Sequence, residues 1–284
     1  MTPPFKPPFN PTKKPLALAL RPAFPVRLKP DAGMPSATKL IAAPARTVWA
    51  KGQNGTEKLV PPSAPGGVGL DSQAVRARML RRLAAQGVCD AQVLATMGAV
   101  ERHRFVDSAL ANQAYEDTSL PIGLGQTISK PNVVARMLEL LREGAGPGGK
   151  LGRVLEIGTG CGYQAALLSR LASEVYSIER LRGLHDKARE NLRTLRLANV
   201  HLLFGDGMIG YAKGAPYAAI IAAAGGQALP PAWIEQLAMG GRLVAPLQTA
   251  SGAPARVVVD KTPQGIRQTL LEAVHFVPLK SGTS

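Results

Sequence analysis

Three glycines at alternate positions follow a short hydrophobic run, "RVLEIG" (153–158). Glycine lets a chain turn tightly and lets its backbone come close to a bound molecule, so Gly158, Gly160 and Gly162 indicate a ligand-binding turn. A dinucleotide fingerprint has the spacing G-x-G-x-x-G and needs a third glycine at position 163, where this chain has Tyr163. The turn reads G-x-G-x-G and therefore departs from the dinucleotide pattern.

Three acidic residues accompany this turn at predicted strand ends: Glu156, Glu179 and Asp206. Glu156 comes just before the turn, which disfavours a bound pyrophosphate and suits a zwitterion with an ammonium group. Glu179 is placed to accept hydrogen bonds from both hydroxyls of a ribose, and Asp206 to accept one from an adenine amino group. S-adenosyl-L-methionine has an ammonium, a carboxylate and a sulfonium but no phosphate, so it is the predicted ligand. The alternative is a tight turn without a ligand, with Glu179 a solvated acid.

The stretch "IIAAAGGQALPP" (220–231), after the fourth predicted strand, bears on which methyl acceptor the protein uses. Methyltransferases that act on the exocyclic amines of bases often carry an Asn/Asp-Pro-Pro-aromatic turn here. This chain offers no side chain to bind an amine and no aromatic ring to stack on a base. The small residues 222–226 leave room for a backbone-like acceptor.

A second informative stretch, "SLPIGLGQTISKP" (119–131), lies upstream of the glycine turn and combines glycines with the hydroxyls of Thr127 and Ser129. It precedes a predicted helix, so its backbone N–H groups can face a carboxylate. The alternative is an ordinary polar loop in which Ser129 caps the helix that begins at Pro131.

The elements around these residues alternate between strand and helix, which predicts a parallel sheet covered by helices on both faces. Ligands of such sheets bind beyond the carboxyl ends of the strands. Helices are expected upstream, after Asp71 (ending at Gly87), after Asp90 and over 131–144. Paired strands, 255–260 and 266–279, are expected at the end. The alternating elements are expected at 153–158, 163–172, 174–179, 184–197, 200–207, 217–224, 230–241 and 242–247.

Composition divides the 284 residues into two parts. Residues 1–70 carry +8 of the net charge of +15 and 14 of the 24 prolines. Such a segment buries too little apolar surface to offset its ordering entropy. The sequence predicts a disordered, basic, proline-rich extension (1–70), without specific function or as an electrostatic tether, and one folded domain (71–284).

The chain has two cysteines, Cys89 and Cys161, which are too few for a disulfide framework. This low number favours a reduced, cytoplasmic location. No apolar run approaches the length of a membrane span. The four histidines are scattered without metal-ligand spacing, so no metal is expected. A monomer is expected, and nucleic-acid contact by the basic tail has no support in aromatic residues, because Trp49 stands alone.

Taken together, the motifs resemble the protein-L-isoaspartate O-methyltransferase family. The resemblance runs from about residue 72 to 280, and the "GQTIS" segment is its most specific part. It implies a Rossmann-like, doubly wound, mostly parallel methyltransferase fold with N-terminal helices and a C-terminal strand pair. It is carried by "AYEDTSLPIGLGQTISKPNVVARMLELL" (114–141), "VLEIGTGCGYQAALLSRL" (154–171), "GDGMIGYAKGAPYAAII" (205–221), "LPPAWIEQLAMGGRLVAPL" (229–247) and "FVPL" (276–279).

This resemblance implies methyl transfer from S-adenosyl-L-methionine to the free carboxylate of L-isoaspartyl residues in damaged proteins, which initiates their repair. Ser129 takes the catalytic place, orienting the carboxylate, with Thr127 and Ile128 beside it. The peptide is flanked by Leu120, Pro121, Ile122 and Val277. The cofactor contacts map onto Glu156, Gly158, Thr159, Gly160, Glu179, Asp206 and Gly207.

The chain also departs from the family pattern. Ala218 stands where the family commonly has Asp, and Asn132 where a basic or aromatic residue is frequent. "AAAGG" replaces the usual "AAAP" or "AAPP". These changes affect the acceptor loop rather than the cofactor. An RNA methyltransferase, suggested by the charge, and an inactive binding protein that uses its basic tail are the alternatives.

Overall fold

The computed structural model describes residues 73–145, 149–249, 252, 254–273 and 276–284. The predicted extension, residues 1–70, and Asp71 as a helix cap lie outside the described residues. None of the helices within the described ranges is long and apolar enough to cross a membrane.

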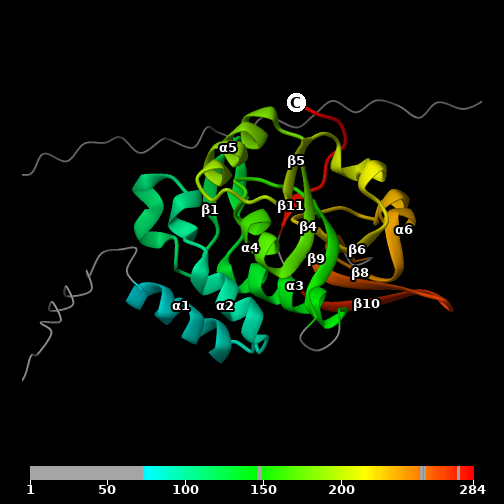
Figure 1. Cartoon of the computed structure of the whole chain (residues 1–284), viewed down its shortest axis with the longest axis horizontal. Coiled ribbons are helices and arrows are strands. Elements are labelled where there is room, and N and C mark those ends of the chain that lie inside the picture. Colours follow the sequence, from blue (N-terminus) through cyan, green and yellow to red (C-terminus); the bar gives the residue numbers. More distant parts are fainter. Residues whose placement is uncertain (1–72, 146–148, 250–251, 253, 274–275) are drawn as a thin grey trace, which may run out of the picture. The chain divides into compact units, whose positions relative to one another are not determined.

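A seven-stranded sheet forms the centre of the described unit, in the order β10-β9-β8-β6-β3-β4-β5 (Figure 1). The five strands from β8 to β5 run parallel, and β9 and β10 are added antiparallel at the other edge. β3 lies between β4 and β6, so the chain reverses its direction of winding there, which is where open α/β sheets bind ligands. The strands are β3 (Leu151–Ile157), β4 (Ala172–Glu179), β5 (Val200–Phe204), β6 (Tyr217–Ala222), β8 (Leu237–Gln248), β9 (Pro254–Thr262) and β10 (Gly265–Ala273).

Helices cover both faces of this sheet because successive strand side chains point to opposite sides. Val154 belongs to one hydrophobic cluster, together with residues of α3 (Pro131–Glu143), α4 (Tyr163–Leu171) and α5 (Arg182–Arg193). Its neighbour Leu155 belongs to the other, where Trp233 of α6 (Pro231–Gln236) is buried. The predicted doubly wound α/β fold is confirmed.

Two N-terminal helices, α1 (Gln73–Ala85) and α2 (Ala91–Ala99), pack on each other and on α3 and α4. α2 begins as predicted, because the Asp90 carboxylate accepts hydrogen bonds from the backbone N–H groups of Gln92 and Val93. Between α2 and α3 lie two short 3₁₀ turns, η1 (Arg102–Phe105) and η2 (Ser108–Gln113).

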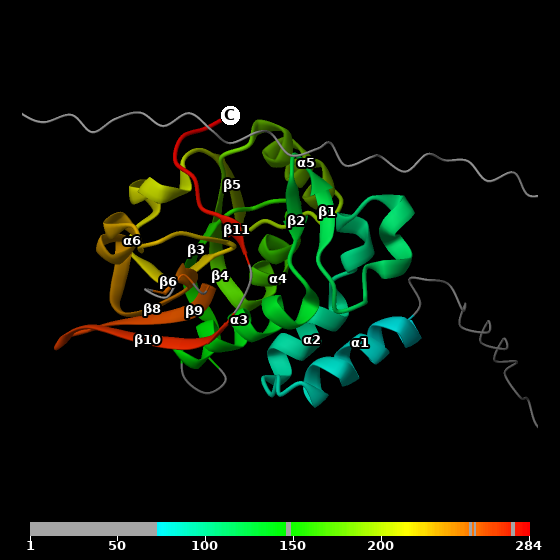
Figure 2. The same ribbon diagram turned by 180° about the vertical axis from the view of Figure 1, so that it is seen from behind.

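A β-hairpin, absent from the prediction, precedes α3, where an ordinary polar loop with Ser129 as the helix cap was the alternative interpretation. It consists of β1 (Leu120–Gly123) and β2 (Gln126–Ile128), which pair antiparallel, and it stands beside α5 (Figure 2). Ser129 follows β2 and does not cap α3. The cap position is Lys130, and the carboxylate of Asp117 accepts the N–H of Asn132 instead.

Several boundaries differ from the prediction in the last third of the chain. The helix expected over 184–197 is Arg182–Arg193, the strand expected over 200–207 ends at Phe204, and the strand expected over 242–247 begins at Leu237. The helix expected over 230–241 ends at Gln236, because Leu237 pairs with β6 and Gly240 (φ +77°) disfavours a helix. The strand expected over 217–224 ends at Ala222, and β7 (Ala224–Gly225) follows as a separate strand. The stretch 266–279 is two strands: β10 ends at Ala273, and β11 (Val277–Pro278) pairs parallel with β7.

Candidate active site

A cavity of about 380 Å³ opens at the carboxyl ends of the parallel strands. It brings together the glycine turn, the end of β4, the β1–β2 hairpin and the C-terminal segment, which are far apart in the chain. Predicted site residues in its lining are Ile122, Thr127, Gly158, Gly160, Glu179, Gly207 and Val277. A larger, more open depression on the outer side of α5 contains none of the predicted residues.

The glycine turn joins β3 to α4 in a backbone conformation that residues with a side chain rarely adopt. Gly158, Gly160 and Gly162 all have positive φ, at +90°, +57° and +91°. A Cβ at Gly160 would come within 3.2 Å of Ile122 Cδ1, which belongs to the hairpin. Glycine is therefore needed both for the backbone conformation of the turn and for the close approach of the hairpin.

Glu179 ends β4 and is 5% exposed. Its two carboxylate oxygens accept hydrogen bonds from the backbone N–H groups of Gly160 and Leu181, each at 2.9 Å. A carboxylate has about four acceptor positions, so lone pairs remain for a ligand. The carboxylate is held rigidly against the turn and lines the cavity, which is the arrangement predicted for a ribose contact.

Glu156 and Thr159 point into the protein rather than lining the cavity. The Ser177 hydroxyl contacts the Glu156 carboxyl at 2.5 Å and the Thr159 hydroxyl at 2.6 Å. Burial raises the pKa of Glu156 to about 8, and the nearby charge of Glu179 acts in the same direction. The neutral Glu156 carboxyl supports the turn from inside the protein and not from the cavity. A direct contact between Glu156 and a cofactor therefore stays a prediction.

Asp206 follows β5 and lies outside the lining of the cavity. One carboxylate oxygen accepts the N–H of Met208, which caps the 3₁₀ turn η3 (Gly207–Ile209), and the other accepts the N–H of Gly282 at 2.7 Å. The next residue, Gly207, does line the cavity. Asp206 thus connects the cofactor side of the cavity to the C-terminal segment.

The acceptor hairpin, which we define as residues 120–129, forms the opposite wall. Thr127 is exposed and lines the cavity, while Ile128 and Leu120 are buried beneath it. Pro121 is exposed outside the lining. Ser129 is half-buried, two residues beyond Thr127, at the base of the hairpin. Six of the predicted acceptor-side residues therefore lie on this hairpin, and the seventh, Val277, lines the cavity from β11.

Several lining residues escaped the sequence analysis, because only the folded chain brings them here. Leu124 and Gly125 form the turn of the hairpin, and Arg180 and Lys280 add positive charge to the lining. The glycines at 123 and 125 were the available signal for the turn. The two cations carry no local motif.

The cavity suits a zwitterionic, phosphate-free ligand. Gly158, Gly160 and Gly207 keep one wall free of side chains, and Glu179 places an anion at the end of β4. Arg180 and Lys280 supply cations for a carboxylate. Within the described ranges, no group of three or more His, Cys, Asp or Glu side chains is arranged to hold a metal ion.

Sequence comparisons identify the family of the chain. The family model for protein-L-isoaspartate(D-aspartate) O-methyltransferase (PCMT) matches residues 74–284. A protein-L-isoaspartate O-methyltransferase from Methylibium petroleiphilum is 58% identical over 267 residues, covering 92% of this chain and 97% of the relative. One from Leptothrix cholodnii is 62% identical over 231 residues, covering 81% of each.

Solved structures give the same result. A protein-L-isoaspartate O-methyltransferase superposes with a TM-score of 0.65 at 28% identity, covering 72% of this chain and 66% of its own. A Plasmodium falciparum beta-aspartate methyltransferase (PCMT) in complex with S-adenosyl-L-homocysteine has a TM-score of 0.63 at 25% identity, covering 72% and 98%. The chain belongs to the protein-L-isoaspartate(D-aspartate) O-methyltransferase family.

Proposed function

We propose that this chain transfers a methyl group from S-adenosyl-L-methionine to the free carboxylate of L-isoaspartyl residues in damaged proteins. The observation that carries the proposal is the single cavity in which the glycine turn and Glu179 face the acceptor hairpin. The names of the homologues, and the S-adenosyl-L-homocysteine in the Plasmodium structure, support the same assignment.

The chemistry asks little of the protein in proton transfer. Bound S-adenosyl-L-methionine supplies an electrophilic methyl group on a sulfonium. A carboxylate, with an ordinary pKa near 4, is already ionised at neutral pH and needs no general base. The residues of the cavity therefore act by binding, orienting and excluding water. Glu179 and the glycine turn bind on the cofactor side, and the hairpin orients the acceptor.

Selectivity follows from the shape of the substrate. An isoaspartyl residue runs its backbone through the side-chain carbon, so its free carboxylate sits where an α-carboxylate would. The hairpin and Val277 border the cavity where this kinked backbone would lie. The backbone amide nitrogen of the next residue can then displace methanol from the methyl ester to form a succinimide, whose hydrolysis returns some normal aspartate and starts repair.

Transfer of labelled methyl groups tests the proposal. The protein is incubated with labelled S-adenosyl-L-methionine and an isoaspartyl peptide, its aspartyl counterpart, or RNA. We expect label on the isoaspartyl peptide alone. Label on RNA would support the alternative methyltransferase, and no transfer at all would indicate a binding protein.

Ser129 is assigned to orient one oxygen of the acceptor carboxylate. We expect Ser129→Ala to lower turnover of the isoaspartyl peptide with little change in S-adenosyl-L-methionine affinity. Ser119→Ala, an exposed serine just before the hairpin and outside the cavity lining, is the matched variant and should keep wild-type turnover. Unchanged activity in Ser129→Ala would remove the assigned role.

The proposal includes a cytoplasmic, monomeric enzyme with a basic extension outside the folded domain. Both cysteines, Cys89 and Cys161, are free thiols, which is compatible with a reducing compartment. Light scattering of the full chain tests the monomer, and limited proteolysis tests the boundary near residue 70.

A further inference from the structure

We infer that Arg102 and Lys187 are positioning residues that fix the acceptor hairpin by binding its backbone from two sides. The inference rests on the proposed function, since it assigns these residues to the acceptor side of the cavity. Both side chains donate to hairpin carbonyl groups, Arg102 to Ser129 at the base and Lys187 to Ile122 near the turn.

Arg102 binds the base from inside the protein. It is fully buried, and its guanidinium donates to the carbonyls of Ala114 at 2.7 Å and Ser129 at 2.8 Å. Its central carbon lies 4.9 Å from the centre of the Tyr163 ring, at the start of α4 directly after the glycine turn. A planar guanidinium donates in fixed directions, so it sets the Ser129 backbone relative to the turn that would hold the cofactor.

Supporting a loop with a buried arginine is energetically unfavourable. Desolvation of a charge costs free energy, and two carbonyl acceptors with one aromatic ring return part of it. Arg102 forms no ion pair among the described residues, and the Asp117 carboxylate acts on its charge only from beyond ion-pair distance. Its contacts instead join three segments of the chain, which contain Ala114, Ser129 and Tyr163 and meet beside the cavity.

Lys187 binds the other end of the hairpin from α5. Its ammonium donates to the carbonyl of Ile122 at 2.8 Å. Ile122 lines the cavity and would clash most closely with a side chain at Gly160. Lys187 is half-buried and forms no ion pair within the described ranges. The contact therefore fixes how closely the hairpin approaches the glycine turn.

Together the two cations hold the hairpin at both ends without touching the expected place of the methyl acceptor. A shift of about 1 Å in a reacting group can reduce a rate about 100-fold, so loss of either contact is expected to affect the chemical step. Cofactor binding should change less, because the glycine turn and Glu179 are untouched.

Five single variants test this role: the four described next and Arg102→Lys. Arg102→Met and Lys187→Met remove the hairpin contacts. Arg82→Met is matched to the first, because Arg82 donates to the neighbouring carbonyl of Tyr115. Lys261→Met is matched to the second, because Lys261 donates to carbonyls at the end of α6, including Leu237 at 2.7 Å. Calorimetry counts the sites that bind S-adenosyl-L-methionine, and kcat on the isoaspartyl peptide is expressed per such site.

We expect kcat per binding site to fall about 30-fold in Arg102→Met and about fivefold in Lys187→Met, with Kd for S-adenosyl-L-methionine within about twofold. Arg102→Lys should recover part of the loss, because lysine still reaches one carbonyl. The matched variants should keep kcat within about twofold. A Kd that changes as much as kcat, or an equal loss in the matched variants, would overturn the inference.

Two further outcomes are decided by the same set. If Arg102→Met does not fold, the half-exposed Lys187 decides the matter, and an unchanged kcat in Lys187→Met overturns the inference. If the wild-type chain does not methylate the peptide, the proposed function fails. Hydrogen exchange then tests whether the two cations hold the acceptor hairpin. Faster exchange over 120–128 in Lys187→Met than in Lys261→Met supports this role, and equal exchange contradicts it.

Discussion

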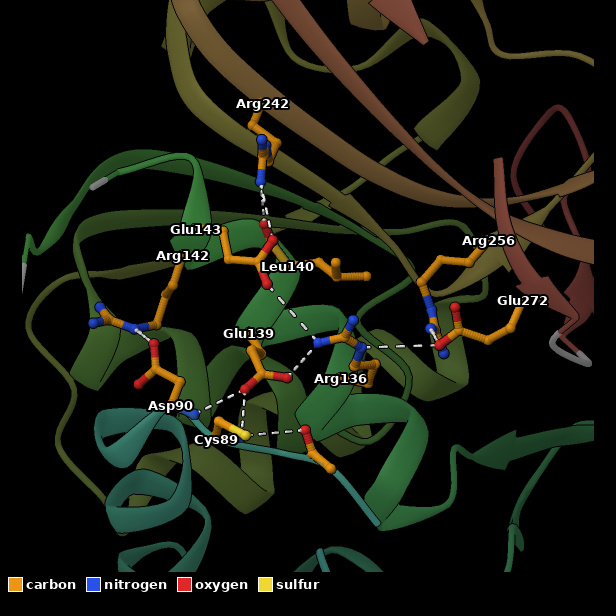
Figure 3. A network of polar contacts seen from close by, with 11 residues as sticks. Cys89, Asp90, Arg136, Glu139, Leu140, Arg142, Glu143, Arg242, Arg256 and Glu272 are labelled. Carbon is orange, nitrogen blue, oxygen red and sulfur yellow. Dashed lines mark hydrogen bonds and ion pairs between the residues drawn. The ribbon is translucent and has the colours of Figure 1, made fainter. Parts of the chain in front are cut away.

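Acidic residues at the carboxyl edge of the sheet and acidic residues around α3 have different partners. At the edge, Glu156, Glu179 and Asp206 accept hydrogen bonds from hydroxyl and backbone N–H groups, and none forms an ion pair within the part of the chain that the structure describes. Around α3, the acids face arginines (Figure 3). We call this second group the α3 network; it contains Asp90, Arg136, Glu139, Arg142, Glu143, Arg242, Arg256, Asp260, Arg267 and Glu272.

The α3 network joins elements that meet only in the folded chain. Arg136 of α3 contacts Glu139 of the same helix and Glu272 of β10, while Arg242 of β8 contacts Asp260 of β9 and the carbonyl of Leu140. These contacts attach the antiparallel edge of the sheet to the helix that follows the acceptor hairpin. The network therefore holds in place the element on which the acceptor side depends.

Ionisation shows what the difference means. Burial acts to raise the pKa of Asp260, but hydrogen bonds from Arg242 and Arg267 outweigh it and hold the pKa below its usual value. Glu156 has no such cation, and burial raises its pKa to about 8. Arginines neutralise the acids that hold the fold, whereas Glu179, the acid that lines the cavity, keeps acceptor positions for the turn and for a ligand.

The largest expected effect comes from removing the acid that lines the cavity. Glu179→Ala should raise Kd for S-adenosyl-L-methionine about 50-fold, since hydrogen bonds to a charged group contribute about 1.5–3 kcal/mol. Glu174→Ala is the control, because Glu174 lies on the same strand but pairs with Arg153 away from the cavity. Calorimetry measures both, and an affinity of Glu179→Ala within twofold of wild type would remove this residue from the ribose site.

Removal of an acid from the α3 network should act on stability instead. Asp260→Asn loses charge pairing with Arg242 and Arg267 and should lower the free energy of unfolding by about 2 kcal/mol, with unchanged cofactor affinity. The folded pKa of Asp260 is depressed, so its stabilisation is present above the unfolded pKa near 3.8 and is lost as pH falls through the folded pKa. Urea unfolding of both proteins from pH 7 down to pH 3 should show the difference shrinking. A constant difference would refute the pairing.

Glu156 should show the opposite pH dependence. Its folded pKa, about 8, lies above the ordinary 4.5, so the unfolded chain loses its proton first and stability falls as pH rises between these values. Glu156→Gln cannot ionise, and its Tm relative to wild type should rise by a few degrees between pH 5 and pH 9. Thermal unfolding across this range measures it, and parallel curves would show that Glu156 ionises normally.

The smallest effect is expected at Asp206. Asp206→Asn keeps one acceptor oxygen but loses the charge and one of the hydrogen bonds to Met208 and Gly282, so cofactor affinity should fall about fivefold. Hydrogen exchange should become faster over 279–284 as the C-terminal segment loosens. Slow exchange retained in this segment would show that Asp206 does not hold it.

Local patterns predicted the strand–turn–helix unit well. The glycine spacing placed the turn between β3 and α4, and the Asp90 cap placed the start of α2. Such features depend on backbone conformations and hydrogen bonds within a few residues. The alternation of strand and helix patterns also predicted the order of the remaining elements of the parallel sheet.

Features set by distant contacts were not predicted. The acceptor hairpin has a glycine turn, but its pairing and its support by Arg102 and Lys187 depend on η1 and α5. The inward direction of Glu156 follows from the pleat of β3 within a covered sheet. The break after Ala273 arises because Val277 pairs with β7 rather than β9.

A crystal structure of the full chain with S-adenosyl-L-homocysteine tests the central claim most directly, because it places the cofactor in one region or another. The account predicts the ligand in the cavity between the glycine turn and the acceptor hairpin, with its ribose on Glu179. A ligand bound in the depression outside α5, or a cavity in which Glu179 contacts no ligand atom, would contradict the account.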